Sequence, residues 1–181
     1  MSRADVKRAA LGSLAFAALT ALAARVELPL PLSPVPVSLQ SLAVVLSGLL
    51  LGARIGALSQ ALYLLVGALG LPVFAGGAAG LDVLLGATGG YLVAFVPAAA
   101  LAGWAGRREA GTARRLGWSF LTGLLAHAAI FALGLPWLMV VAELGIAETL
   151  EAGCTPFLPG AVAKSFVAAA IATPRRVPPI S

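Results

Sequence analysis

The sequence predicts an all-α integral membrane protein with six transmembrane helices and both termini on the cytoplasmic side. Composition is the first observation behind this prediction, because 60% of the 181 residues are hydrophobic and only 10% are charged. A soluble domain of this size carries about a quarter charged residues. The second observation is that the apolar residues form long uncharged runs, and the third is the sign of the charges between these runs. We expect one transmembrane domain over residues 1–181.

Six runs have about the length of a bilayer-spanning helix, which needs roughly 20 apolar residues and ranges from about 17 to 25. The runs are 9–24, 37–53, 55–71, 81–105, 116–142 and 159–173. Only a short turn around Gly52 and Arg54 separates the second run from the third. These two runs are therefore expected to form a tight helical hairpin.

The N-terminal run follows Arg3, Lys7 and Arg8 and ends near the sequence Ala-Leu-Ala at 21–23, an arrangement that resembles a secretory signal peptide. Its uncharged part, 9–24, is at the long end for a signal-peptide core, and further spans follow it. We interpret the run as an uncleaved first helix, with cleavage as the alternative.

Small side chains recur every four residues along this first helix, at Ala9, Ser13, Ala17 and Ala21. A ridge of small residues lets two helices approach closely, so that van der Waals contact supplies the attraction between them. The ridge has two interpretations, which are packing inside this chain and docking onto a separate membrane subunit.

The charges between the runs set the orientation, because cytoplasmic loops are enriched in Lys and Arg. With the N-terminus inside, two basic residues fall on the outer side, Arg25 and Lys164. The inner side collects the other basic residues, namely Arg3, Lys7, Arg8, Arg54, Arg107, Arg108, Arg114, Arg115, Arg175 and Arg176. The outer side also receives most of the acidic residues, namely Glu27, Asp82, Glu143, Glu148 and Glu151. An odd number of spans would put the C-terminal arginines outside, so the charges favour six.

The connections on the outer side contain the unusual backbone. Residues 28–36 are rich in Pro, 71–81 contain a Pro and three Gly, and 154–160 contain two Pro and a Gly. Closely spaced prolines favour an extended, stiff segment with little helix. Irregular backbone at membrane depth is tolerated only where it is buried in protein or lines a cavity. These segments therefore predict a pocket that opens outward and is capped by loops.

Polar side chains within apolar spans are costly and often functional. Lys164 stands near the start of the last run, where it either reaches the lipid headgroups or meets a carboxylate or carbonyl together with the free N–H groups of the helix start. Gln40 can cap the second helix or bond another helix, and its amide can also both donate to and accept from a urea or amide ligand. Tyr91 and Trp137 fit an aromatic belt or a stacking role. His127 fits a packing role better than a proton relay.

The sequence argues against several other classes of function. It contains no paired intramembrane carboxylates, no Ser–His arrangement and no HExxH motif, so an enzyme is not expected. The glycines of 86–90 are not followed by Gly-Lys-Ser/Thr, so no phosphate-binding loop for ATP is present. They predict instead a close neighbour, either backbone or ligand. One His and one Cys provide no metal site, and the dispersed basic residues argue against nucleic-acid binding despite a net charge of +5.

Taken together, the outer-face segments resemble one known family. The matching stretches are Pro34-Val-Pro-Val-Ser-Leu-Gln40, Leu62-Tyr-Leu-Leu-Val-Gly67, Leu69-Gly-Leu-Pro-Val-Phe-Ala-Gly-Gly77, Gly86-Ala-Thr-Gly-Gly-Tyr-Leu92, Leu135-Pro-Trp-Leu138, and Pro156-Phe-Leu-Pro-Gly160 with Lys164. Their order and spacing are similar to those of the BioY family, the biotin-capturing S components of energy-coupling factor (ECF) transporters. The resemblance covers about 9–172, nearly the whole chain.

The resemblance implies a six-helix S-component fold in the bacterial cytoplasmic (inner) membrane that captures biotin from outside and needs no cofactor. It also implies two kinds of partner, an ECF transmembrane coupling subunit and a pair of ATPases. The small-residue ridge of the first helix matches the surface on which such proteins dock to the coupling subunit. Two alternatives stay open, an S component for another vitamin and a stand-alone biotin facilitator.

For the ligand site, the resemblance implies residues in the same outer segments. Those expected to bind or enclose the ligand are Lys164, Gln40, Thr88, Tyr91, Phe74, Gly76, Gly77, Trp137 and Phe157. The chain departs from the family pattern at two positions. Ala87 replaces a usual proline, which changes the helix geometry mildly. Ala161 replaces an acid that is usual three residues before Lys164, which alters the contacts available to the ureido group.

Overall fold

The computed structural model describes residues 3–30, 33–105 and 111–173, and most of these residues are helical. In chain order the elements are α1 (Arg3–Ala23), β1 (Glu27–Leu30), β2 (Ser33–Ser38), α2 (Gln40–Leu51), α3 (Ala53–Ala68), η1 (Ala75–Gly77), α4 (Leu81–Leu85), α5 (Gly89–Val93), α6 (Phe95–Ala105), α7 (Thr112–Val141), α8 (Ile146–Gly153), η2 (Thr155–Phe157) and α9 (Leu158–Ala172).

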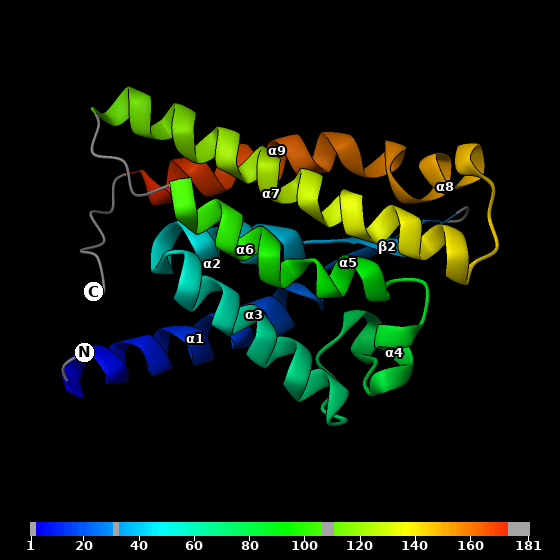
Figure 1. The fold of residues 1–181 in the computed structure, drawn as a ribbon, viewed down its shortest axis with the longest axis horizontal. Coiled ribbons are helices and arrows are strands. Elements are labelled where there is room, and N and C mark those ends of the chain that lie inside the picture. The colour runs from blue at the N-terminus through cyan, green and yellow to red at the C-terminus, as the bar shows by residue number, and fades with distance from the viewer. Residues whose placement is uncertain (1–2, 31–32, 106–110, 174–181) are drawn as a thin grey trace.

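The helices form an elongated bundle (Figure 1). At one end of the bundle α1 begins, α6 ends, α7 begins and α9 ends, whereas α4 and α8 lie at the opposite end. In the interior, α2 packs on α3, α6 and α9, and α7 packs on α5, α6 and α9. The start of α1 and the end of α9 thus lie at the same end of the molecule.

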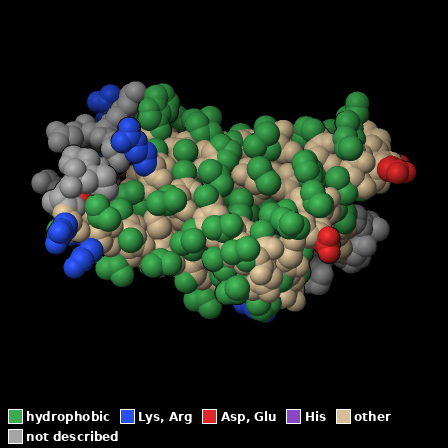
Figure 2. All heavy atoms as spheres, turned by 60° about the horizontal axis from the view of Figure 1, so that its bottom comes forward, with side chains coloured by type: hydrophobic (Ala, Val, Ile, Leu, Met, Phe, Trp, Pro, Cys, Tyr) green, Lys and Arg blue, Asp and Glu red, His purple; other side chains and the backbone are tan. Residues whose placement is uncertain are grey.

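The surface between the two ends of the bundle is apolar. Figure 2 shows hydrophobic side chains over most of the visible face, several Lys and Arg side chains at one end, and Asp and Glu side chains at the other. Large apolar side chains are widely exposed, for example Leu11 (67%), Trp104 (76%) and Val140 (73%). A soluble monomer rarely exposes an apolar surface of this extent, whereas a lipid-embedded bundle requires it.

Four of the arginines assigned to the inner side lie outside the described residues, namely Arg107, Arg108, Arg175 and Arg176.

The predicted spans coincide with apolar helical segments. Among the described residues, Arg3–Ala23, Thr112–Val141 and the stretch Ile146–Ala172 are long and apolar enough to cross a membrane. Three shorter apolar helical stretches lie mostly within the other predicted runs, namely Gln40–Leu51, Ala53–Ala68 and Gly89–Trp104. The number of crossings and their direction stay predictions.

The tight turn predicted between the second and third runs is confirmed. Only Gly52 separates α2 from α3, and its φ of 84° lies in the left-handed region that favours glycine. The two helices then pack at backbone distance, because a Cβ on Gly56 would lie 2.8 Å from the Gly48 Cα. On the other face of α2, a Cβ on Gly48 would lie 2.9 Å from the Gly103 amide of α6. Glycine therefore brings α2, α3 and α6 together.

A β-hairpin precedes α2, so the all-α prediction is incomplete. β1 and β2 pair antiparallel, with Glu27 opposite Ser38 and Leu28 opposite Val37. The second run was expected to be helical from residue 37, but the helix begins at Gln40 because the preceding residues belong to β2. Prolines at 34 and 36 favour the extended conformation and lack the N–H groups that a helix needs. The extended segment that these prolines predicted is thus confirmed, and its pairing with residues 27–30 is new.

The fourth run, 81–105, is not one helix. It is divided into α4, α5 and α6, with Gly86 in an extended conformation (φ −79°, ψ −173°) after α4. The second break, at Ala94, precedes Pro97, which cannot donate the intrahelical hydrogen bond to the Val93 carbonyl. The short helix α8 was not predicted either, because its charged residues interrupt the apolar pattern.

Candidate ligand-binding site

A cavity of about 360 Å³ lies between the hairpin, the start of α2, the middle of α7 and the start of α9. The segment between α3 and α4 also lines it, as do α4 and α5. Its lining is mostly apolar with a few polar groups, as in small-molecule sites, which occupy about 300–1,000 Å³. Most residues predicted to bind the ligand lie in this lining, namely Lys164, Gln40, Thr88, Tyr91, Phe74, Gly76 and Phe157. The fold thus brings together side chains that are more than 120 residues apart in the sequence, and their contact with a ligand stays a prediction.

Lys164 is half-buried, and its ammonium is turned toward the hairpin rather than toward the lipid headgroups. Its Nζ donates to the Ser38 carbonyl at 2.6 Å and to the Ser41 Oγ at 3.2 Å. An ammonium has three N–H donors, so one donor stays available to the cavity that the side chain lines. Lys164 therefore joins α9 to the end of β2 while keeping one hydrogen bond for a ligand.

Gln40 belongs to a hydrogen-bond network in the cavity wall. Its Nε2 donates to the Tyr63 Oη at 2.6 Å, and its Oε1 accepts from the Ser38 Oγ at 2.9 Å. Tyr63 in turn donates to the Val73 carbonyl at 3.2 Å. The network orders the hairpin, α3 and the segment after α3 around the cavity. Gln40 keeps one N–H and one oxygen lone pair for a ligand, because a primary amide has two of each.

Aromatic side chains form part of the apolar wall. Phe74 is 1% exposed and packs edge-on against Tyr63, with ring centroids 5.5 Å apart. Its ring fills the space above Gly67, where a Cβ would overlap it. Phe157, at the end of η2, lines the cavity next to the start of α9. Tyr91 also lines the cavity, and its hydroxyl donates to the Gly153 carbonyl at 3.0 Å and so joins α5 to α8.

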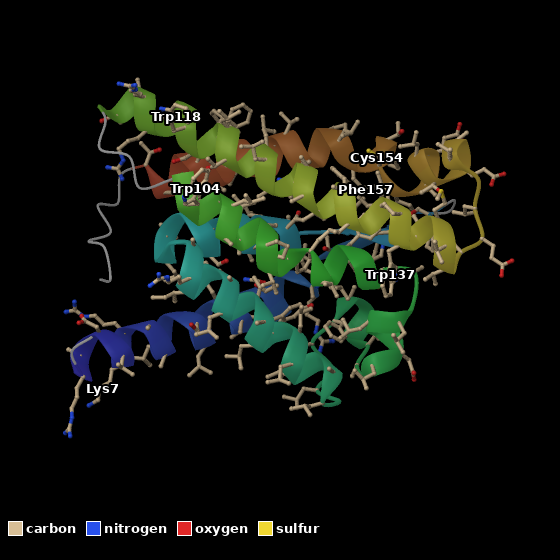
Figure 3. The ribbon with its side chains drawn as sticks, in the orientation of Figure 1. Lys7, Trp104, Trp118, Trp137, Cys154 and Phe157 are labelled. Atoms are coloured by element: carbon tan, nitrogen blue, oxygen red, sulfur yellow. The ribbon has the colours of Figure 1, made fainter. Side chains whose placement is uncertain are left out.

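Trp137 was expected to shield the ligand, but the cavity lining does not include it. Its Nε1 donates to the Gly86 carbonyl at 2.9 Å, and its side chain occupies the place where a Cβ on Gly90 would lie. The glycine-rich segment 86–90 predicted a close neighbour, either backbone or ligand. A Cβ on Gly90 would meet the Trp137 side chain and the Leu133 carbonyl, and one on Gly89 would meet the Leu84 carbonyl, so backbone is a close neighbour and a side chain is another. Figure 3 shows Trp137 toward the end of the bundle opposite Trp104 and Trp118, which agrees with the aromatic-belt interpretation.

The remaining predicted positions are turn residues. Gly76 and Gly77 have φ of 65° and 78°, which favours glycine at both. Gly76 lines the cavity, whereas Gly77 packs against the guanidinium of Arg25, which also donates to the Pro72 carbonyl. Thr88 precedes α5 and is half-buried in the cavity wall.

The sequence interpretation missed several lining residues. The largest group is apolar, namely Val83, Leu92, Phe95, Ile130 and Phe131. In the sequence these residues look like any other residue of an apolar span, so no signal distinguishes them. His127 was interpreted as a packing residue, yet it also lines the cavity. Glu27 of β1 contributes a carboxylate to the lining.

The small-residue ridge of α1 faces this chain's own helices along most of its length. Ala9, Ser13 and Ala17 are buried, and α1 packs on α2 and α3. The interpretation of the ridge as internal packing accounts for these three residues. Farther along α1, Ala17 and Ala21 line an apolar groove of about 470 Å³ between α1 and α3. Docking of another subunit on the ridge stays a prediction, and this groove is where the surface leaves room for it.

Comparison with known proteins identifies what this arrangement is similar to. The model of the BioY family matches residues 1–178. A probable biotin transporter BioY from Pyrococcus horikoshii is 38% identical over 157 residues, which cover 87% of this chain and 89% of that protein. The biotin transporter BioY from Rhizobium etli is 34% identical over 164 residues, which cover 88% and 87%. The fold matches the crystal structure of the S component for biotin from an ECF-type ABC transporter, with a TM-score of 0.84, 23% identity, and coverage of 96% of this chain and 93% of that one.

Proposed function

This chain belongs to the BioY family, and from this premise we propose that it captures biotin as the S component of an ECF-type transporter. The observation that carries the proposal is the cavity of about 360 Å³ with one lysine ammonium in an otherwise mostly apolar wall. Biotin has an apolar chain and ring with a polar group at each end. Such a ligand suits a pocket with an apolar lining and a few placed polar groups.

In the proposed complex, Lys164 uses its remaining N–H to hold one polar end of biotin. Thr88, Gln40 and the hydroxyl oxygen of Tyr91 offer further polar contacts, while Phe74 and Phe157 enclose the apolar part. The hairpin and the segment 71–81 form the wall through which the ligand enters. All these groups line one cavity, which supports their assignment to one site.

We place the protein in the bacterial cytoplasmic membrane as one transmembrane domain with six crossings and both termini inside. The apolar belt and the segregation of charge support this placement, because cytoplasmic ends are enriched in Lys and Arg. The cavity then lies toward the outer half of the bilayer, among the connections with the irregular backbone.

The proposal assigns the energy for release to other subunits. A transmembrane coupling subunit and an ATPase pair would supply it, since the sequence of this chain has no motif for binding the phosphates of ATP. The groove beside Ala17 and Ala21 is the docking place that we assign to the coupling subunit. No cofactor other than the ligand is required.

Binding of biotin to the purified full-length chain in detergent tests the proposal. Isothermal titration calorimetry should give saturable binding with one site per chain. A thermal-shift series with biotin and other vitamins should show that biotin raises the melting temperature most, because a ligand that binds only the native state stabilises it by mass action. Stabilisation by a different vitamin alone would assign the chain to that vitamin, and stabilisation by none would refute ligand capture.

Uptake by a stand-alone protein is the second candidate function. Expression in cells that lack a coupling module and cannot make biotin distinguishes a stand-alone facilitator from an S component that needs its coupling module. Growth on trace biotin in those cells would favour a facilitator, whereas co-purification with a coupling subunit and ATPases in a native host would favour the transporter complex.

A further inference from the structure

A buried side-chain nitrogen of a residue in the cavity wall has no hydrogen-bond partner among the described residues. His127, in the middle of α7, is 4% exposed and lines the cavity. Its Nδ1 lies 2.9 Å from the Gly123 carbonyl oxygen and 3.0 Å from the Ser165 Oγ. Within the part of the chain that the structure describes, Nε2 has no hydrogen-bond partner. An unpaired buried polar group is costly, so its presence needs an explanation.

The surroundings of Nδ1 determine which nitrogen of the imidazole carries the proton. The Gly123 carbonyl can only accept, so the 2.9 Å contact requires a proton on Nδ1. Ser165 donates its hydroxyl proton to the Ala161 carbonyl at 2.8 Å, which leaves its oxygen as a second acceptor for Nδ1–H. In a neutral imidazole with the proton on Nδ1, Nε2 carries a lone pair. A second positive charge beside Lys164 in this apolar wall would be unfavourable. His127 therefore carries a buried hydrogen-bond acceptor with no described partner, on a side chain that lines the cavity.

This acceptor lies in the same wall as a donor. Lys164 directly precedes Ser165 in α9, and both Lys164 and His127 line the cavity. Two of the three N–H groups of Lys164 are bound to Ser38 and Ser41, which leaves one for a ligand. Ala161, three residues before Lys164, faces the same cavity and has no polar side-chain atom. A planar ligand group with a carbonyl next to an N–H matches one donor beside one acceptor.

We propose that His127 is a specificity-determining residue whose Nε2 accepts a hydrogen bond from an N–H of the ligand beside the Lys164 ammonium. The inference rests on the proposed function, and it fixes the orientation of the ligand. Biotin has N–H groups only in its ureido ring, since its carboxylate and thioether have none at neutral pH. The ureido ring then lies against α7 and α9, and the carboxylate points away from His127.

Two substitutions separate the two nitrogens of the imidazole. In His127→Asn, the side-chain amide reaches the position of Nδ1 and can still donate to the Gly123 carbonyl, but no atom reaches the position of Nε2. In His127→Gln, the longer side chain can place its carbonyl oxygen near the position of Nε2. By calorimetry on the purified full chain, we expect His127→Asn to weaken biotin binding at least tenfold and His127→Gln to recover part of the loss. Binding by His127→Asn within twofold of the wild type would overturn the inference.

Ligand analogues test the same contact without changing the protein. Two analogues of biotin each carry a methyl group on one of the two ureido nitrogens. At least one of these analogues should bind the wild type at least tenfold more weakly than biotin does. In His127→Asn the same methyl group should cost less than threefold. Biotin methyl ester, which alters only the carboxylate end, should lose the same factor in both proteins. Full-strength binding of both N-methyl analogues to the wild type would refute the contact even if no variant at position 127 folds.

The outcomes also separate this inference from the proposed function. If the wild type does not bind biotin, the proposed function fails. If the wild type binds biotin and neither the Asn substitution nor the N-methyl groups weaken binding, only the role of His127 fails. Melting temperatures without ligand serve as the folding control. If His127 were purely structural, its replacement would lower the melting temperature but would leave the preference for the ureido N–H groups unchanged.

Discussion

Replacing Lys164 by Met measures how much of the binding energy comes from one ammonium. Met keeps an unbranched apolar stem in the same wall but removes every N–H donor, both the two that hold the hairpin and the one available to a ligand. A hydrogen bond to a charged group contributes about 1.5–3 kcal/mol. Since 1.4 kcal/mol corresponds to a factor of ten, the Kd for biotin should rise about 10- to 150-fold.

Ser41→Ala is the matched control for this substitution. It removes only the longer of the two anchoring bonds, at 3.2 Å, and leaves the bond to the Ser38 carbonyl in place. The ligand takes no part in this bond, so its loss, about 1.5–3 kcal/mol because the ammonium is charged, should lower mainly the melting temperature, and the Kd should rise less than in Lys164→Met. Both variants are compared with the wild type by calorimetry in detergent, with melting temperatures as the folding check. A Kd for Lys164→Met within twofold of the wild type would refute a contact between the ammonium and the ligand.

Three further substitutions test the packing around the cavity by thermal unfolding in detergent, and a fourth, Gly117→Ala, is a control on α7. Gly90→Ala should destabilise the protein by about 1–3 kcal/mol because the added Cβ would overlap Trp137, whereas Gly117→Ala, with no described atom near its Cβ, should stabilise α7 by up to about 1 kcal/mol. Equal effects of the two would contradict the packing argument. Phe74→Ala should lower the free energy of unfolding by about 3–5 kcal/mol because it leaves a hole where a fully buried ring was. An unchanged melting temperature would show that the neighbouring side chains fill this hole without loss of stability. Tyr91→Phe should cost about 0.5–1.5 kcal/mol through the lost bond to α8, and a larger loss of biotin affinity than of stability would place its hydroxyl on the ligand.

The positions of the helices could be predicted because charges delimit the apolar runs, and lipid leaves a membrane protein little choice but helix in such runs. The turn at Gly52 and the extended segment before Gln40 could be predicted from local backbone preferences. The pairing of that segment with residues 27–30 could not, because strand pairing depends on contacts between two segments. The break of the fourth run at Gly86 was hidden for a similar reason, since the bond from Trp137 that accompanies it comes from a distant helix.

The candidate site was predicted in part. Lys164 and Gln40 stand out because they are polar residues in apolar surroundings, and Phe74 lies in a conspicuous turn segment. The cavity lining includes His127, which the sequence favoured as a packing residue, and it does not include Trp137, which was expected beside the ligand. The contact of either residue with a ligand stays a prediction. Both lie on α7, which is apolar around most of its circumference, so the sequence does not show which face meets the cavity. Only the packing of α5 and α9 against α7 decides this.

The glycine contacts between α2, α3 and α6 have a mechanical consequence. Helices whose backbones interlock at Gly48, Gly56 and Gly103 cannot slide along one another without steric overlap. These three helices should therefore move as one rigid unit. The motions that accompany ligand binding and release must then occur in the hairpin, in the segment 71–81 and in the surrounding helices. Spin labels on α2 and α6 should keep a constant separation throughout a turnover cycle, while a label on the hairpin should not.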